Sequence, residues 1–186
     1  MPAILLTAPA VEPLSLDEAK AFLRVEHDAD DDIIAALITG ARIHIEAQTR
    51  RALITQAWRL TLDRWPDDGR LPVRPGPLRE LTAARVYDFN NVAHEIDLQA
   101  FVPDIAASSL SFVPWAMPAP GRLAAGIELD VTLGYGAAAA DVPEPLRQAI
   151  RLLTAHWFDN RGVSGPATVL PSTVSALIAP YRMLSL

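Results

Sequence analysis

The sequence contains no cysteine among its 186 residues. This excludes disulfide bridges, thiolate metal ligands and cysteine nucleophiles together, and it fits assembly in a reducing compartment. No apolar run is long enough to cross a bilayer, so no membrane partner is expected. The N-terminal stretch MPAILLTAPAVEP lacks the basic residues with which a secretory signal peptide begins, and the chain has no internal repeat.

Positive charge is also scarce. Sixteen Lys and Arg residues face 22 Asp and Glu residues, which gives a net charge of -6 and a pI of about 5.1. This balance argues against a nucleic-acid binder that works through a broad basic face, but it allows a surface along which nucleic acid passes without sticking. A hydrophobic fraction of 51% with 20% charged residues indicates a globular chain, and the length suits one domain with a real core.

Catalytic and metal-binding motifs are missing as well. The four histidines show no paired ligand spacing, and neither a P-loop nor a G-x-S-x-G elbow occurs; the histidines are His27, His44, His94 and His156. His44 and Glu46 form an H-x-E, but the zinc deaminase signature also needs cysteines. We therefore expect no catalytic residues, no metal and no cofactor. A soluble hydrolase or a small binding module of unknown substrate remains the alternative.

Two segments imitate ligand sites. The acidic run HDADDD at 27–32 begins like an EF-hand loop, but Ile33 stands where glycine is needed, so we interpret it as a helix start capped by Asp28. Gly134-Tyr135-Gly136 with Ala139 spells G-x-G-x-x-A. A dinucleotide site needs a helix that opens directly on the glycines, whereas here the chain first runs on to Asp141. We interpret these glycines as turn residues.

Helical periodicity dominates both ends of the chain. The central helix is predicted over 142–161, where Leu146, Ile150, Leu153 and Trp157 form an apolar stripe that should be buried in the core, and Gly162 should cap its end. Two earlier helices are predicted near 15–25, with a capping box of Ser15 and Glu18, and over 29–50; the preceding residues, up to Pro13, form an extended arm. A short helix starts near Ser172 and stops by Pro180.

Between these helices the hydrophobic period changes to two. Strands are predicted at 58–62, 85–89, 94–98, 110–113 and, most clearly, 127–133, with proline- and glycine-rich breaks between them. Because turns link these strands, antiparallel pairing is expected. The predicted fold class is α+β: one domain over 1–186, with a helical core at about 14–52 and 141–180 and an inserted, mostly antiparallel β region at about 53–136.

The last residues, 181–186, form an apolar tail that follows Pro180. Such a tail docks either on its own domain or on a partner. We expect partner docking, through Tyr181, Arg182, Met183, Leu184 and Leu186.

Four blocks of the chain, taken together, closely resemble the gp6-like head–tail connector family of long-tailed phages, prophages and gene transfer agents. They are PLSLDEAKAFLRV, DDDIIAALITGARIHIEAQTRRALITQAWRL, VTLGYGAAAADVPEPLRQAIRLLTAHWFDNR and LPSTVSALIAPYRM. The resemblance covers nearly the whole chain and is weakest over about 63–126. It implies small helical domains with a variable β insertion, and no catalytic activity.

The resemblance also implies the partners. Family members act as adaptors in the neck of a virion or virus-like particle assembled in the bacterial cytoplasm. They form a ring, a dodecamer by analogy, which binds the portal protein and a stopper, head-completion or tail-terminator protein. DNA passes through the channel of this ring without sequence-specific binding. Terminal segments of these adaptors help to bind the portal, which implies a docking role for 181–186.

Overall fold

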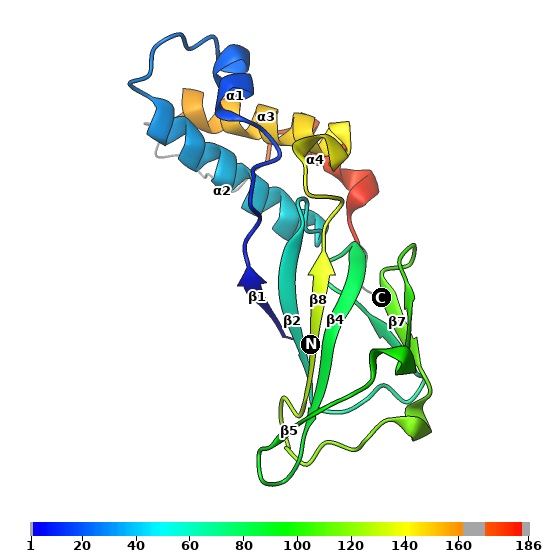
Figure 1. Ribbon diagram of the computed structural model, residues 1–186. Coiled ribbons are helices and arrows are strands. Elements are labelled where there is room, and N and C mark those ends of the chain that lie inside the picture. Colours follow the sequence, from blue (N-terminus) through cyan, green and yellow to red (C-terminus); the bar gives the residue numbers. More distant parts are fainter. Residues whose placement is uncertain (1, 162–169, 184–186) are drawn as a thin grey trace. The chain divides into compact units, whose positions relative to one another are not determined.

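A computed structural model describes residues 2–161 and 170–183. The chain forms two compact units, whose elements are labelled in Figure 1. The β unit comprises Met1–Pro9 and Thr55–Tyr135, and the helical unit comprises Ala10–Ile54 and Gly136–Leu186. The β region lies between the second and third helices, and its strands pair antiparallel, which confirms the α+β prediction.

In its described residues the helical unit contains four α-helices: α1 (Leu16–Leu23), α2 (Asp31–Thr49), α3 (Glu144–Asp159) and α4 (Ser172–Ile178), with 3-10 turns η3 (Ala139–Asp141) and η4 (Ala179–Tyr181). The predicted capping box is present, because the Glu18 backbone N–H donates to Ser15 Oγ at 3.2 Å and the Ser15 N–H donates to Glu18 Oε2 at 3.0 Å. The predicted cap of α2 is wrong. That helix begins at Asp31, and the Asp28 carboxylate instead accepts a hydrogen bond from Lys20 Nζ at 2.7 Å.

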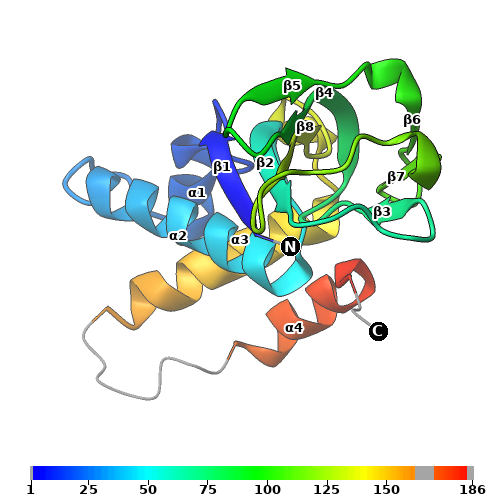
Figure 2. The ribbon, with the colours of Figure 1, turned by 90° about the horizontal axis from the view of Figure 1, so that it is seen from below.

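The core of the helical unit is formed by the facing stripes of α2 and α3, which lie side by side in Figure 2. Fully buried side chains come from both helices and from α4; they include Ile34, Ile45, Leu146, Ile150, Leu153, Val174 and Ile178. The predicted burial of Ile150 is confirmed, whereas that of Trp157 is wrong, because its indole is half-buried. It lies edge-on to the His44 ring, with centroids 5.9 Å apart, on the flank of α2. Gly162, the expected cap of α3, lies outside the described residues.

The β unit holds two antiparallel sheets. The larger has the order β1-β2-β8-β4-β5 and the smaller β3-β7-β6. Their strands are β1 (Ala3–Thr7), β2 (Gln56–Leu62), β3 (Arg70–Pro72), β4 (Leu78–Tyr87), β5 (Ala93–Glu95), β6 (Phe101–Asp104), β7 (Ser109–Phe112) and β8 (Ile127–Leu133); two 3-10 turns are η1 (Leu98–Ala100) and η2 (Pro114–Ala116).

Strand β8 is the centre of the larger sheet. Its four alternate residues Ile127, Leu129, Val131 and Leu133 are fully buried, as their pattern predicts. It pairs with β2 on one side and with β4 on the other. Leu129 of β8 lies opposite Leu60 of β2 and opposite Ala84 of β4. Alternate residues therefore point to two faces, one apolar and buried and one lined by charged side chains.

Three strands were not predicted. The expected extended arm before Pro13 contains β1, which pairs with β2. The segments between the predicted strands contain β3 and β6, which both pair with β7. The strand predicted at 85–89 has a different position, since β4 begins at Leu78 and ends at Tyr87, which leaves Phe89 in the following turn. Beneath the smaller sheet the rings of Trp65, Phe101 and Phe112 form a cluster with centroids 5.1–5.9 Å apart.

Candidate functional site: docking surfaces without catalytic chemistry

The histidines are scattered through the structure. His44 lies against Trp157 in the helical unit, and His94 Nε2 lies 3.1 Å from Asp88 Oδ2 in the β unit. Within residues 2–161 and 170–183, no group of three or more His, Asp or Glu side chains could hold a metal ion.

The acidic run after α1 is bound by cations of the chain itself. Lys20 Nζ lies 2.7 Å from Asp28 Oδ1 and 2.6 Å from Asp31 Oδ1. Arg161 Nη1 lies 3.0 Å from Asp30 Oδ1. The run thus connects α1 to the start of α2 and to the end of α3, and it does not form the convergent oxygen cage that calcium needs.

The glycine turn after β8 is filled by a carboxylate. Asp141 Oδ2 accepts a hydrogen bond from the Ala138 backbone N–H at 2.9 Å, and a Cβ atom at Gly136 would collide with this carboxylate. Gly134 has φ +120°, a conformation that side chains other than glycine rarely adopt. Gly134 and Tyr135 lie in a bend and Gly136 in an isolated bridge to Ile54, so these residues form the connection between β8 and η3.

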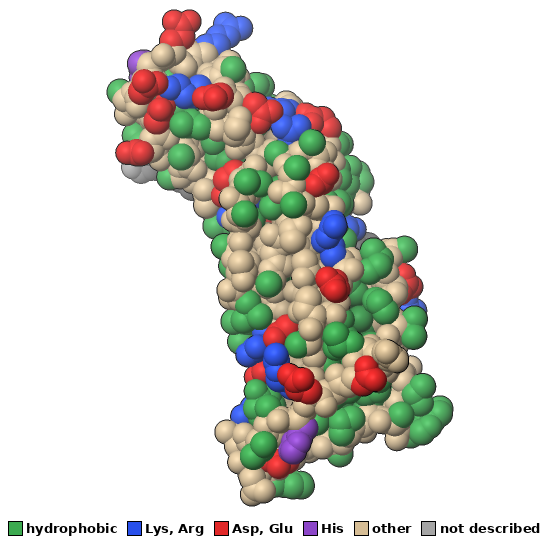
Figure 3. All heavy atoms as spheres, viewed as in Figure 1, with side chains coloured by type: hydrophobic (Ala, Val, Ile, Leu, Met, Phe, Trp, Pro, Cys, Tyr) green, Lys and Arg blue, Asp and Glu red, His purple; other side chains and the backbone are tan. Residues whose placement is uncertain are grey.

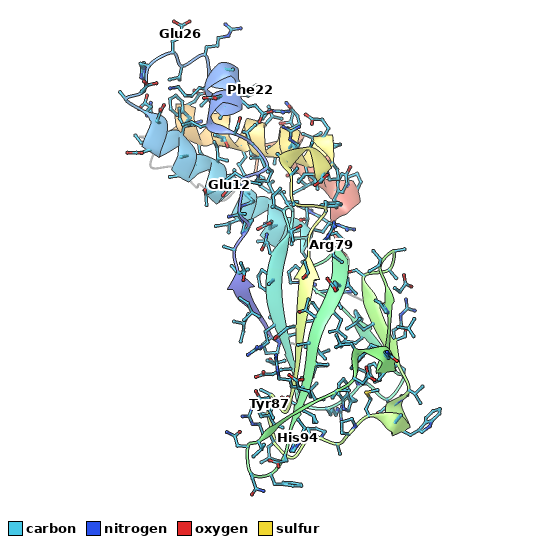
Figure 4. All side chains as sticks on the ribbon, viewed as in Figure 1. Glu12, Phe22, Glu26, Arg79, Tyr87 and His94 are labelled. Carbon is cyan, nitrogen blue, oxygen red and sulfur yellow. The ribbon has the colours of Figure 1, made fainter. Side chains whose placement is uncertain are left out.

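A groove of about 310 Å³ lies in the helical unit between the segment before α1 and the flank of α2. Its lining is mainly apolar: Val11, Glu12, Leu14, Ser15, Leu16, Ala35, Ile38 and Thr39. Its carboxylate, Glu12 (labelled in Figure 4), accepts hydrogen bonds from Thr39 Oγ1 at 3.0 Å and from Arg42 Nε at 2.7 Å. Arg42 also donates to Glu46 at 2.8 Å. The acid is thus held in an ion-pair network, which makes it a structural group.

The charged face of the larger sheet centres on Asp130 in β8. Arg59 of β2 donates to both of its carboxylate oxygens, at 2.7 and 2.9 Å, and Arg85 of β4 donates to Oδ2 at 2.8 Å. The hydrogen bond from Arg59 is the main cause that lowers the pKa of Asp130; burial opposes it and Arg85 adds to it. The cluster is a cross-strand ion ladder that joins three strands.

This ladder predicts a pH dependence. Because the folded-state pKa of Asp130 is depressed, its contribution to stability is present above the ordinary aspartate pKa and is lost as pH falls through the folded value. Asp130→Asn should therefore lower the free energy of unfolding at pH 7, and the difference from wild type should shrink below about pH 4. Urea unfolding at a series of pH values measures this. A difference that stays constant down to pH 2 would contradict the role assigned to the ion pairs.

The described part of the tail lies on the end of α2. Arg51 Nε donates to the Tyr181 carbonyl at 2.6 Å, and the Met183 backbone N–H donates to the Thr49 carbonyl at 3.1 Å. Arg182 is exposed, with Nη2 3.4 Å from Gln48 Oε1. Leu184 and Leu186 lie outside the described residues. The sequence did not indicate these α2 partners, because the contacts join residues about 130 positions apart.

Residues 13–99 match the family model described as phage gp6-like head–tail connector protein. This part of the chain is similar to the gp6-like head–tail connectors. Three solved structures are similar to this chain over almost its full length. Each match also covers 97% of the chain in the solved structure.

These structures come from gene transfer agent particles. The neck of an empty particle, computed with C6 symmetry, matches 100% of this chain with 28% identity and a TM-score of 0.85. The virion of a native particle matches 100% with 27% identity and a TM-score of 0.84, and the neck of a native particle computed with C12 symmetry matches 98% with 28% identity and a TM-score of 0.76. A comparison with curated protein sequences finds no match. Within the described residues, no helix of the chain is long and apolar enough to cross a membrane.

Proposed function

We propose that this connector is the adaptor subunit of a ring in the neck of a virion or gene transfer agent particle, assembled in the bacterial cytoplasm. The ring joins the portal protein to a stopper, head-completion or tail-terminator protein, and it has a structural role without catalysis. The carrying observation is the full-length match, at 28% identity, to a subunit of particle necks. The C12 symmetry of one matched neck supports a ring of about twelve copies.

The charge of the chain suits a channel for DNA. Lys and Arg side chains along a channel would bind phosphates and hold the DNA. This connector has a net charge of -6, and many of its guanidinium groups are paired with carboxylates, as in the Asp130 ladder. A ring of such subunits lets DNA pass without sequence-specific binding.

The C-terminal tail is the proposed portal-docking segment. The Arg51 side chain, just after α2, donates to the Tyr181 carbonyl, and the Met183 N–H donates to the Thr49 carbonyl at the end of α2; these two hydrogen bonds order the start of the segment in each subunit. The apolar side chains of Leu184 and Leu186 then follow this fixed point in the sequence, and Arg182 offers a cation for a portal carboxylate. Pre-ordering of the start of the segment lowers the entropic cost of docking the rest.

Variants of the last residues test the docking. Removal of 181–186 also removes the two hydrogen bonds to α2, so the sharper variant is Leu184→Ser combined with Leu186→Ser, which keeps both. We expect this protein to melt like wild type but to be absent from portal-bearing heads, which then remain without tails. Thermal melts, immunoblots of purified heads and counts of joined particles measure the three quantities.

The matched control is Leu98→Ser, which changes a 39%-exposed leucine of the β unit and should leave head binding intact. Normal joining by the double tail variant would show that the tail is not the docking segment. A melting point lowered by several degrees would show instead that the tail docks on its own domain.

A further inference from the structure

The β unit presents large hydrophobic side chains to solvent at one end. Phe89 is 91% exposed and Val92 51% exposed in the turn between β4 and β5, and Leu123 is 100% exposed in the segment before β8. We call the end formed by residues 63–64, 88–97 and 119–126 the tip. Scattered exposed apolar residues are ordinary on a protein surface, whereas an exposed Phe, Val and Leu on adjoining loops mark an interaction site.

The two loops of the tip are held together tightly. The Gly121 N–H donates to the Tyr87 carbonyl at 2.7 Å, and a Cβ atom at Gly121 would collide with the backbone of Asp88 and Phe89. The Arg122 guanidinium lies 3.5 Å from the centroid of the Tyr87 ring, and its Nε donates to Asn91 Oδ1. The loop that carries Leu123 therefore packs directly on the turn that carries Phe89.

Each loop is also fixed on its own. Asp88 Oδ1 accepts hydrogen bonds from the N–H groups of Asn90 and Val92, both at 2.9 Å, and Oδ2 lies 3.1 Å from His94 Nε2. Asp63 Oδ1 accepts from the Ala125 N–H at 2.7 Å. An apolar anchor on a fixed loop binds at a smaller entropic cost than one on a mobile loop.

The tip lies at one end of the larger sheet. Leu62 pairs with Ile127 next to the tip, while Gln56 pairs with Leu133 at the far end of the same two strands. The chain enters this unit at Thr55 and leaves it at Tyr135, beside that far end. Figure 4 labels Tyr87, the last residue of β4 before the tip, and His94, which lies in the tip.

Charge decides which partner suits the tip. Its carboxylates, Asp63, Asp88, Glu95 and Asp97, outnumber its guanidinium groups, Arg64 and Arg122. In Figure 3 the same end, recognisable by its purple histidine, shows green hydrophobic groups beside red carboxylates. A second copy of this acidic chain and the phosphates of DNA would both be repelled, whereas a protein with a basic surface would be attracted.

We propose that the tip is a second docking site, which inserts Phe89 and Leu123 into an apolar pocket, rimmed by Lys or Arg, on a non-identical protein of the particle. The site is separate from the C-terminal tail, so one chain contacts partners through both of its units. The aromatic and aliphatic anchors supply the burial, and the surrounding carboxylates select the basic rim.

The test uses complete particles from the producing strain, with the chromosomal gene replaced by Phe89→Ser combined with Leu123→Ser. Both positions are almost fully exposed, so the melting point of the purified variant should equal that of wild type. The yield of joined, tail-bearing particles should fall at least about tenfold, because the loss of both anchors weakens the contact that each copy in the ring makes with the partner protein. The single variant Phe89→Leu, with Leu123 unchanged, keeps an apolar anchor at position 89. Its yield of joined particles should be close to that of wild type.

The matched control is Trp115→Ser, which changes an 89%-exposed aromatic on η2 and should join normally. A photo-reactive phenylalanine analogue at position 89 identifies the occupant in intact particles. A cross-link to a different chain, at a site flanked by Lys or Arg, supports the proposal, while a cross-link to another copy of this chain, or an undiminished yield from the double variant, overturns it. If wild-type connector is absent from the particles, the neck role itself fails, which is a distinguishable result.

Discussion

Arg42→Ala should destabilise the connector by about 3–5 kcal/mol, the usual result of removing one partner from a buried ion pair. Only 9% of the Arg42 side chain is exposed, and it bridges Glu12, in the segment before α1, to Glu46, one turn further along α2. Without the guanidinium, both carboxylates remain in a partly desolvated position and lose their cation. Urea unfolding at pH 7 measures the loss.

A double-mutant cycle separates the ion pair from the packing of the Arg42 stem. If the Arg42–Glu12 contact carries the effect, Glu12→Ala should cost much less in the Arg42→Ala background than in wild type, with a coupling of about 1–3 kcal/mol. Additive losses, or an unchanged midpoint for Arg42→Ala, would show that the network adds nothing to stability.

Ile150→Ala should cost about 2–5 kcal/mol, because Ile150 is fully buried between α3 and its neighbours and the cavity cannot collapse without moving a helix. Trp157→Ala should cost less, even though it removes more atoms, because its indole is half-buried on the flank of α2. Thermal melts of the two variants side by side give the order. A larger loss for Trp157→Ala would place that ring in the core after all.

Local signals in the sequence account for the elements that were predicted well. The capping box of Ser15 and Glu18 and the period of the α3 stripe involve residues within one or two turns of each other, so the sequence alone reveals them. Strand β8 was predicted for the same reason, since its alternation from Ile127 to Leu133 is uninterrupted. The family resemblance rested on the order of such blocks along the chain.

Non-local contacts account for what was missed. Strand β1 forms because its backbone pairs with β2, more than 50 residues away, and β3 lies in a stretch whose prolines argue against a strand. The Asp28 cap was wrong because Lys20 binds its carboxylate. The burial of Trp157 was wrong because a helical stripe does not reveal that its last residue lies on the flank of α2, beside His44. The partners of the tail and the two-loop tip likewise depend on tertiary pairing.

The most direct test of the adaptor role is a cryo-EM reconstruction of the neck of particles from the producing strain. The account predicts a ring of about twelve copies of this chain between the portal and the tail, in agreement with the matched C12 neck. A neck whose densities are all explained by other chains, with this one absent from the particle, would contradict it.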